Sequence, residues 1–265
     1  MILYSHTGDS LGVHKYSDYN VNWSPVYLAT SWYFYKHDSA TGYDTSKIDL
    51  DVCRKRAKEM KKGGIHETTG PLVLDIEAFN FGEGNWEYAQ KQLISAIEIY
   101  REELPHLRMG FYGVMPRRDY WNPVLYRNNP ANEIYKDNYK KWKKHNTLFR
   151  SERRDSLSYK SYQGLADYVD FISPSLYTFY SDIPGQLLYM EENIKEARRY
   201  NKPIIPWLWT SYHDSNSALK YTYLGSYYMQ QQFDLVKEME VEGVILLNWN
   251  VSDTPQEFFE VLSSL

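Results

Sequence analysis

Short apolar segments rich in β-branched residues alternate with amphipathic segments along most of the chain, and this alternation constrains the fold more than any other feature. It is typical of βα units, in which parallel strands form a sheet that helices cover. In one amphipathic segment, the helical period places Ala89, Leu93 and Ala96 on one face. The predicted strands span residues 26–34, 71–79, 108–115, 168–177, 203–212 and 243–250, and residues 2–5 are a further candidate.

A closed barrel is favoured over an open doubly wound sheet. No glycine-rich phosphate-binding turn follows the first strand, whereas open dinucleotide-binding sheets carry one there. A chain of 265 residues with 43% hydrophobic residues can bury one large core. We therefore predict an α/β fold: a single domain over residues 1–265, built as a (β/α) TIM-like barrel of seven or eight strands, some of them irregular. Gly63 and Gly243 are predicted helix stops.

Composition excludes several other classes of protein. No run of about 18 apolar residues is present, which argues against a membrane-spanning helix and a membrane partner. The single cysteine, Cys53, cannot form an internal disulfide, and the seven histidines are scattered, so we expect no metal site and no other cofactor. The first ten residues lack the layout of a secretory signal. Because such a signal could have been removed, the sequence does not fix the cellular compartment. Secretion or export to a periplasm is expected only if a signal peptide was removed.

Aromatic residues make up 17% of the chain, with 26 Tyr and 8 Trp, which is more than a core of this size needs. Flat aromatic faces stack on sugar rings, and their polar groups can reach sugar hydroxyls. A glycan-binding groove is therefore one use for them. An aromatic-rich core is the alternative, and composition alone does not separate the two.

A long segment over residues 117–160 interrupts the βα rhythm. It holds twelve Lys or Arg against five Asp or Glu, a net charge of +7 in a chain whose net charge is −4. If it overhangs the active-site face, it could attract an anionic polysaccharide. A solvated helix through residues 140–144 is the alternative. Nucleic acid is a poorer partner, because the whole chain is acidic and carries no nucleic-acid motif.

Two carboxyl groups follow one strongly hydrophobic segment, in the sequence Leu74-Asp-Ile-Glu77. Side chains of a strand alternate between faces, so Asp75 and Glu77 should point the same way at the carboxyl end of the strand, where barrel enzymes place catalysis. The charge of Asp75 and partial desolvation would raise the pKa of Glu77 and make it a general acid. Helix capping, pairing with basic side chains or a metal site are the alternatives for this pair.

Five short motifs lie at or near the predicted strand ends. They are Leu72-Val-Leu-Asp75-Ile-Glu77, Gly110-Phe-Tyr112-Gly-Val-Met-Pro116, Pro174-Ser-Leu-Tyr177, Trp209-Thr-Ser-Tyr212-His-Asp214 and Gly243-Val-Ile-Leu-Leu-Asn-Trp249. In order and spacing they resemble the hyaluronidase family of glycoside hydrolases over residues 70–262, as a distant, disulfide-free relative of bacterial type. Where the family has an Asp after the second motif, this chain has Arg117-Arg118 before Asp119. This difference leaves open that the substrate contains another amino sugar.

The resemblance implies retaining, substrate-assisted hydrolysis of a polysaccharide that contains N-acetylhexosamine, such as hyaluronan or chondroitin. It makes Glu77 the acid and later the base, while Asp75 and Tyr212 hold and polarise the substrate's acetamido group. The implied substrate-binding residues are Tyr177, Trp249, Tyr112, Asp214 and Trp209.

Three alternatives remain open on the sequence. Each of the aromatic residues could simply pack the barrel. The protein could be a polysaccharide lyase, in which Tyr212 or Tyr177 abstracts the proton at C5 of a uronate. It could also be a barrel that binds a glycan without turnover, since barrels host many functions.

Overall fold

The structure is a computed structural model. It describes residues 2–6, 23–38, 42–65, 70–76, 86–150, 152–153, 161–162, 164–247 and 256–263.

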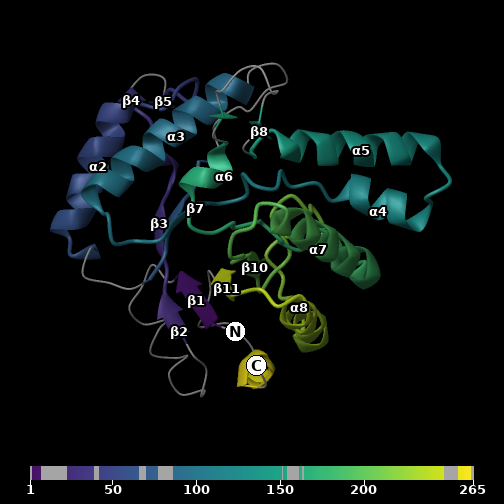
Figure 1. Ribbon diagram of the computed structural model, residues 1–265. Coiled ribbons are helices and arrows are strands. Elements are labelled where there is room, and N and C mark those ends of the chain that lie inside the picture. Colours follow the sequence, from purple (N-terminus) through teal and green to yellow (C-terminus); the bar gives the residue numbers. More distant parts are fainter. Residues whose placement is uncertain are drawn as a thin grey trace.

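Parallel strands form the core of the molecule, with helices around them (Figure 1). The strands that contribute to it are β1 (Ile2–His6), β2 (Trp23–Pro25), β3 (Tyr27–Ala29), β6 (Leu72–Leu74), β7 (Met109–Phe111), β10 (Trp207–Trp209) and β11 (Gly243–Leu247). β1 pairs with β11 on one side and with β2 on the other. β2 and β3 form one extended run interrupted at Val26, and β3 pairs with β6, which pairs with β7.

The circuit of paired strands closes through residues 172–178, which form isolated bridges in place of a continuous strand. Tyr112 bridges to Ser173, and Ser175 bridges to Trp207 at the start of β10. β10 then pairs with β11, which completes the circuit. Within the described residues, the parallel pairings therefore connect seven segments into a closed barrel. The α/β barrel predicted from the sequence is confirmed, and residues 172–178 are its irregular segment.

Helices cover the outside of this barrel (Figure 1). They are α2 (Leu50–Lys62), α3 (Trp86–Glu103), α4 (Trp121–Asn128), α5 (Glu133–Thr147), α6 (Leu165–Tyr168), α7 (Ile183–Arg198), α8 (Ser226–Glu238) and α9 (Gln256–Ser263). α2 and α3 pack together on one side, whereas α7 and α8 pack together on another. No described helix is both long enough and apolar enough to cross a membrane.

Sequence determines where several helices begin and which face they bury. The side chain of Asp49 accepts hydrogen bonds from the backbone N–H groups of Asp51 and Val52, so it caps α2. On α3, the predicted face is buried: Ala89, Leu93 and Ala96 are each almost inaccessible to solvent. α3 therefore presents an apolar stripe to the barrel, and burial of this stripe stabilises the closed fold.

The strands are shorter than predicted, because their carboxyl ends turn into loops. The predicted strand over residues 26–34 ends at Ala29, and a 3-10 helix, η1 (Ser31–Tyr33), follows it. Gly63 does follow α2, as expected. Gly243 does not end a helix: α8 ends at Glu238, and Gly243 begins β11, where a Cβ atom would lie 2.6 Å from the carbonyl oxygen of Ile2.

The segment predicted as a basic excursion contains α4 and α5, which pack against each other, and α4 also packs against α7. In Figure 1 this pair of helices extends to one side of the barrel. Two short antiparallel hairpins complete the description: β4 (His37–Asp38) with β5 (Gly42–Tyr43), and β8 (Glu152–Arg153) with β9 (Ser161–Tyr162).

Candidate active site

A cavity of about 250 Å³ opens at the carboxyl ends of the barrel strands. Asp75 directly follows β6 and Tyr112 directly follows β7, while Leu247 ends β11. This is the edge at which barrel enzymes assemble their active sites from successive strands. The described residues that line the cavity are Leu28, Thr30, Asp75, Tyr112, Tyr177, Trp207, Trp209, His213, Asp214 and Leu247.

The structure brings most of the described candidate residues together. Asp75, Tyr112, Tyr177, Trp209 and Asp214 all line this one cavity, although they come from four different parts of the chain. Their meeting follows from the parallel order of the strands, which places all carboxyl ends on one edge.

Three other candidates are not among the described residues that line the cavity. Glu77 and Trp249 lie outside the described residues. Tyr212 is buried, and it is not among the described residues that line the cavity. Its ring instead packs edge-on against Tyr228, with the ring centroids 6.2 Å apart. Burial raises the pKa of Tyr212, so its hydroxyl stays protonated at neutral pH.

Asp75 is held at the cavity by its backbone. Its N–H donates a hydrogen bond of 2.8 Å to the carbonyl oxygen of Ala29, which continues the pairing of β3 with β6. The side chain is half-buried and its Oδ1 is screened from solvent. Tyr35 is buried nearby, and its pKa is raised first by burial and then by the negative charge of Asp75. Tyr35 is therefore a neutral phenol beside an acidic site.

Aromatic rings form the wall of the cavity. The ring of Tyr112 lies 5.8 Å from that of Tyr177 and 5.3 Å from that of Trp207, and Tyr177 lies 5.3 Å from Trp209. The hydroxyl of Tyr112 donates to Oγ of Ser175 at 3.0 Å, which fixes the orientation of the ring. Such a wall offers faces for stacking on sugar rings and excludes water from whatever binds there.

His213 was not among the candidate residues, yet it lines the cavity and contacts its aromatic wall. The imidazole ring lies 4.7 Å from the ring of Phe179 and 5.8 Å from that of Trp209, and its side chain is only 17% exposed. Its pKa is lowered, chiefly by burial; Asp214 opposes this shift and the positive charge of Arg118 adds to it. His213 is therefore neutral at neutral pH.

A backbone hydrogen bond to His213 favours one tautomer of its neutral ring. Nδ1 accepts a hydrogen bond of 3.1 Å from the backbone N–H of Ser215. A neutral imidazole that accepts at Nδ1 carries its proton on Nε2, so His213 supplies a donor to the cavity. Oδ1 of Asp214 lies 3.0 Å from the same Nδ1, a contact that is favourable when Nδ1 carries a proton. The sequence signal for His213 was its place between two chosen residues after a strand end.

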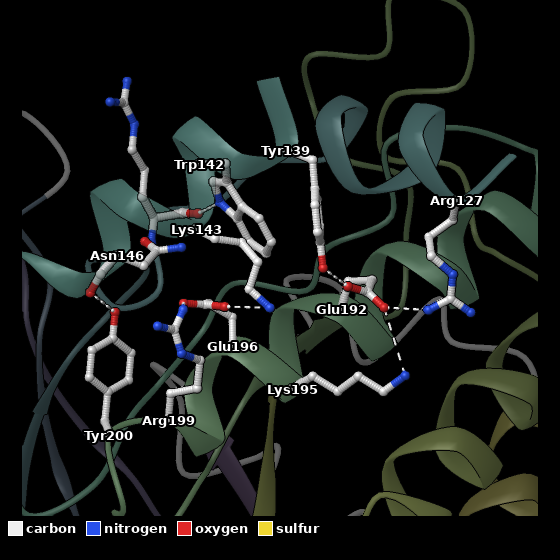
Figure 2. A network of polar contacts seen from close by, with 11 residues as sticks. Arg127, Tyr139, Trp142, Lys143, Asn146, Glu192, Lys195, Glu196, Arg199 and Tyr200 are labelled. Carbon is white, nitrogen blue, oxygen red and sulfur yellow. Dashed lines mark hydrogen bonds and ion pairs between the residues drawn. The ribbon is translucent and has the colours of Figure 1, made fainter. Parts of the chain in front are cut away.

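The loop that follows β7 is supported by a buried polar network between α5 and α7 (Figure 2). Glu192 and Glu196 of α7 are almost completely buried. Glu192 accepts hydrogen bonds from Arg127 of α4 and Tyr139 of α5, and Glu196 lies 3.3 Å from Nζ of Lys143. Part of the positive charge of the basic segment thus neutralises buried carboxylates of the barrel helices, which is a structural role.

Two residues of α5 fix the backbone of Arg117. Nε1–H of Trp142 donates to the carbonyl oxygen of Arg117 at 2.8 Å, and Oδ1 of Asn146 accepts from the backbone N–H of Arg117 at 2.9 Å. Trp142 and Asn146 are both buried, so both hydrogen bonds are shielded from water. The predicted solvated helix is therefore solvated on one face only. Its other face holds the loop from which Arg118 extends.

Comparison with solved structures identifies the architecture. Over 99% of both chains, the protein superposes on bee venom hyaluronidase with a TM-score of 0.63 and 12% sequence identity. The chain shares the barrel fold of that enzyme. A complex of bee venom hyaluronidase with a hyaluronic acid tetramer gives a TM-score of 0.62 at 13% identity, over 98% of this chain and 94% of that chain.

A fungal β-1,4-galactanase is a further relative in fold. It gives a TM-score of 0.50 at 13% identity, over 100% of this chain and 87% of that one. No protein-family model matches the sequence, and no curated protein sequence matches it significantly. At these identities the likeness is one of fold, and function must be argued from the cavity.

A metal site is a separate possibility for a cavity that contains carboxylates. Within the described part of the chain, no three His, Cys, Asp or Glu side chains come together in a way that could hold a metal ion.

Proposed function

We propose that the protein is a glycoside hydrolase that cleaves a polysaccharide containing N-acetylhexosamine. The observation that carries this proposal is the position of Asp75, directly after β6, in a cavity walled by Tyr112, Tyr177 and Trp209. An acidic group among aromatic rings is the arrangement expected of a site that both binds a sugar and acts on its glycosidic bond. The barrel fold shared with bee venom hyaluronidase adds support.

The proposed mechanism is retaining and substrate-assisted. Glu77, two residues beyond Asp75 in the sequence, donates its proton to the glycosidic oxygen, while the acetamido oxygen of the substrate attacks the anomeric carbon. The bond to the leaving sugar breaks and a cyclic intermediate forms. Glu77, now a carboxylate, then takes a proton from the water molecule that opens this intermediate, and the original configuration is restored.

Asp75 has a complementary task in this mechanism. Its carboxylate accepts a hydrogen bond from the acetamido N–H and balances the positive charge that develops on the ring of the intermediate. Because Tyr212 is not among the described residues of the cavity lining, we assign the hydrogen-bond donation to the substrate to Nε2–H of His213. Trp249 remains a proposed sugar-stacking residue, together with Tyr177 and Trp209.

The proposal is tested by digesting hyaluronan, chondroitin and chitin oligomers and determining the mass of the products. Hydrolysis adds one water molecule for each bond cut. Products that absorb in the ultraviolet and contain no added water would identify a lyase, and polymer that is bound but not cut would identify a binding protein. Either result would refute the proposed reaction.

A further inference from the structure

Beside the cavity, three exposed side chains lie on two neighbouring segments: Arg118 just before α4, Trp121 at the first residue of α4, and Tyr180 just before α7. We propose that this rim is a second sugar-binding subsite, which stacks one sugar of the chain on Trp121 and Tyr180 and binds its carboxylate or sulfate through Arg118. The inference rests on the proposed function, since it assigns an acidic glycan to the same protein, and it concerns binding outside the cavity.

The rim and the cavity share one edge of the barrel. Arg118 and Trp121 lie on the chain that leaves β7, and Tyr180 lies on the chain that leaves residues 172–178. These two strand segments are neighbours, because Tyr112 bridges to Ser173. A glycan that extends out of the cavity over this side therefore meets the rim.

The aromatic part of the rim is exposed and held in place. Trp121 is 52% exposed and Tyr180 is 37% exposed, and their ring centroids lie 4.9 Å apart. Tyr120 is buried against both rings, at 5.1 Å from Trp121 and 4.8 Å from Tyr180. The hydroxyl of Tyr228 donates to the carbonyl oxygen of Tyr180 at 3.0 Å, which fixes the backbone there. Supported, exposed rings of this kind lose little entropy when they bind a ligand.

A continuous series of ring contacts joins the rim to the cavity. Tyr120 lies 6.4 Å from Phe179, and Phe179 lies 4.7 Å from His213 in the cavity wall. The guanidinium of Arg118 lies over the ring of Phe179, 5.0 Å from its centroid. Arg118 therefore lies against Phe179, the ring that links the two groups of aromatic residues.

Charge indicates the class of sugar. Among the residues that the structure describes, no carboxylate forms an ion pair with Arg118, whereas Arg127 and Lys143 of the same basic segment pair with buried glutamates. An exposed guanidinium presents a planar set of donors that matches a carboxylate or a sulfate. A uronate or a sulfated sugar is thus the ligand that this position favours.

Two acidic side chains near the rim accept hydrogen bonds from backbone N–H groups. Asp119 accepts hydrogen bonds from the backbone N–H of Asn122, at 2.9 Å, and from its side-chain amide. Asp182, whose charge contributes to the raised pKa of Tyr120, accepts from the backbone N–H of Gly185 at 3.1 Å. Asp182 is the N-cap of α7 and Asp119 accepts from the first turn of α4, so the local helix dipoles offset part of their charge.

The test measures binding by calorimetry in the Glu77→Gln protein, which prevents turnover. The probes are a hyaluronan octasaccharide, a hyaluronan tetrasaccharide and a neutral chitin oligomer. Arg118→Gln should weaken octasaccharide binding roughly 10-fold or more and leave chitin binding unchanged. Trp121→Ala should weaken binding of the hyaluronan octasaccharide and of the chitin oligomer by about 3- to 10-fold. The tetrasaccharide, which makes fewer contacts outside the cavity than the octasaccharide does, should be affected least.

Lys140→Gln, at an exposed lysine of α5, is the matched control and should bind all three probes as the parent does. Equal losses for hyaluronan and chitin in Arg118→Gln, or no loss in either rim variant, would overturn the subsite. Absence of oligosaccharide binding in the parent would overturn it as well. If the variants behave as expected but the wild-type protein cuts no polymer, the subsite stands and the hydrolase proposal fails.

Discussion

Replacement of Glu192 by glutamine tests whether the buried network of α7 holds the α4–α5 pair to the barrel. The Glu192 side chain is only 5% exposed, and it accepts a hydrogen bond from Arg127 at 2.5 Å and another from Tyr139. Glutamine has the same shape but no charge, and it presents an amide nitrogen where one acceptor was. The change therefore isolates the electrostatic contribution of the network from its packing.

The expected loss of stability follows from these two hydrogen bonds. A hydrogen bond to a charged group contributes about 1.5–3 kcal/mol. The contribution of Arg127 must be discounted, because its side chain is 40% exposed and water can replace the lost partner. Tyr139 can still donate to the amide oxygen. We therefore expect Glu192→Gln to lower the free energy of unfolding by about 2 kcal/mol.

Urea unfolding followed by circular dichroism measures this loss, and a double-mutant cycle with Arg127→Met separates the pair from its surroundings. A coupling energy of about 1 kcal/mol between the two positions is expected. As a control, Glu133→Gln removes an exposed ion pair with Lys136 on α5 and should leave the unfolding midpoint unchanged. If Glu192→Gln left the stability unchanged, or if Glu133→Gln lowered it equally, the buried network would not hold the α4–α5 pair to the barrel.

Two further predictions concern the barrel wall and the cavity. Gly110→Ala should destabilise the fold by roughly 1–3 kcal/mol in urea unfolding, because the new Cβ would lie 2.7 Å from both the ring and the carbonyl oxygen of Phe171. Gly63→Ala is the control and should be tolerated, because its Cβ would lie 3.4 Å from its nearest neighbour. In the folded protein, burial lowers the pKa of His213, and the charge of Asp214 opposes this shift. The free energy of unfolding should therefore decrease as the pH falls below 6.5, because the unfolded chain takes up a proton at His213 more readily than the folded protein does. His213→Gln should flatten that part of the profile, and an unchanged slope would contradict the burial argument.

The sequence predicted the barrel and half of its cavity because both depend on local patterns. The hydrophobic run that contains β6 and the carboxylate that follows it place Asp75 at a strand end whatever the rest of the chain does. Tyr112, Tyr177 and Trp209 were predicted from motifs at similar strand ends. Strand lengths were overestimated, since composition does not show where a buried segment leaves the sheet.

The remaining features arise from tertiary contacts. His213 became a cavity residue because the segment after β10 turns toward Phe179 and Trp209, which no periodicity reveals. Glu192 and Glu196 lie four residues apart on α7, a spacing that is equally compatible with an exposed helix face. Only the packing of α4 and α5 against α7 makes them buried partners of a basic segment.

Turnover by a matched pair of variants tests the central claim most directly. The rate of hyaluronan or chitin-oligomer cleavage would be measured by product mass for the wild-type protein, for Glu77→Gln and for Glu98→Gln, an exposed glutamate of α3. The proposed mechanism predicts that Glu77→Gln loses nearly all cleavage while still binding the oligosaccharide, and that Glu98→Gln cleaves as the wild type does. Cleavage retained by Glu77→Gln would contradict its role as the proton donor.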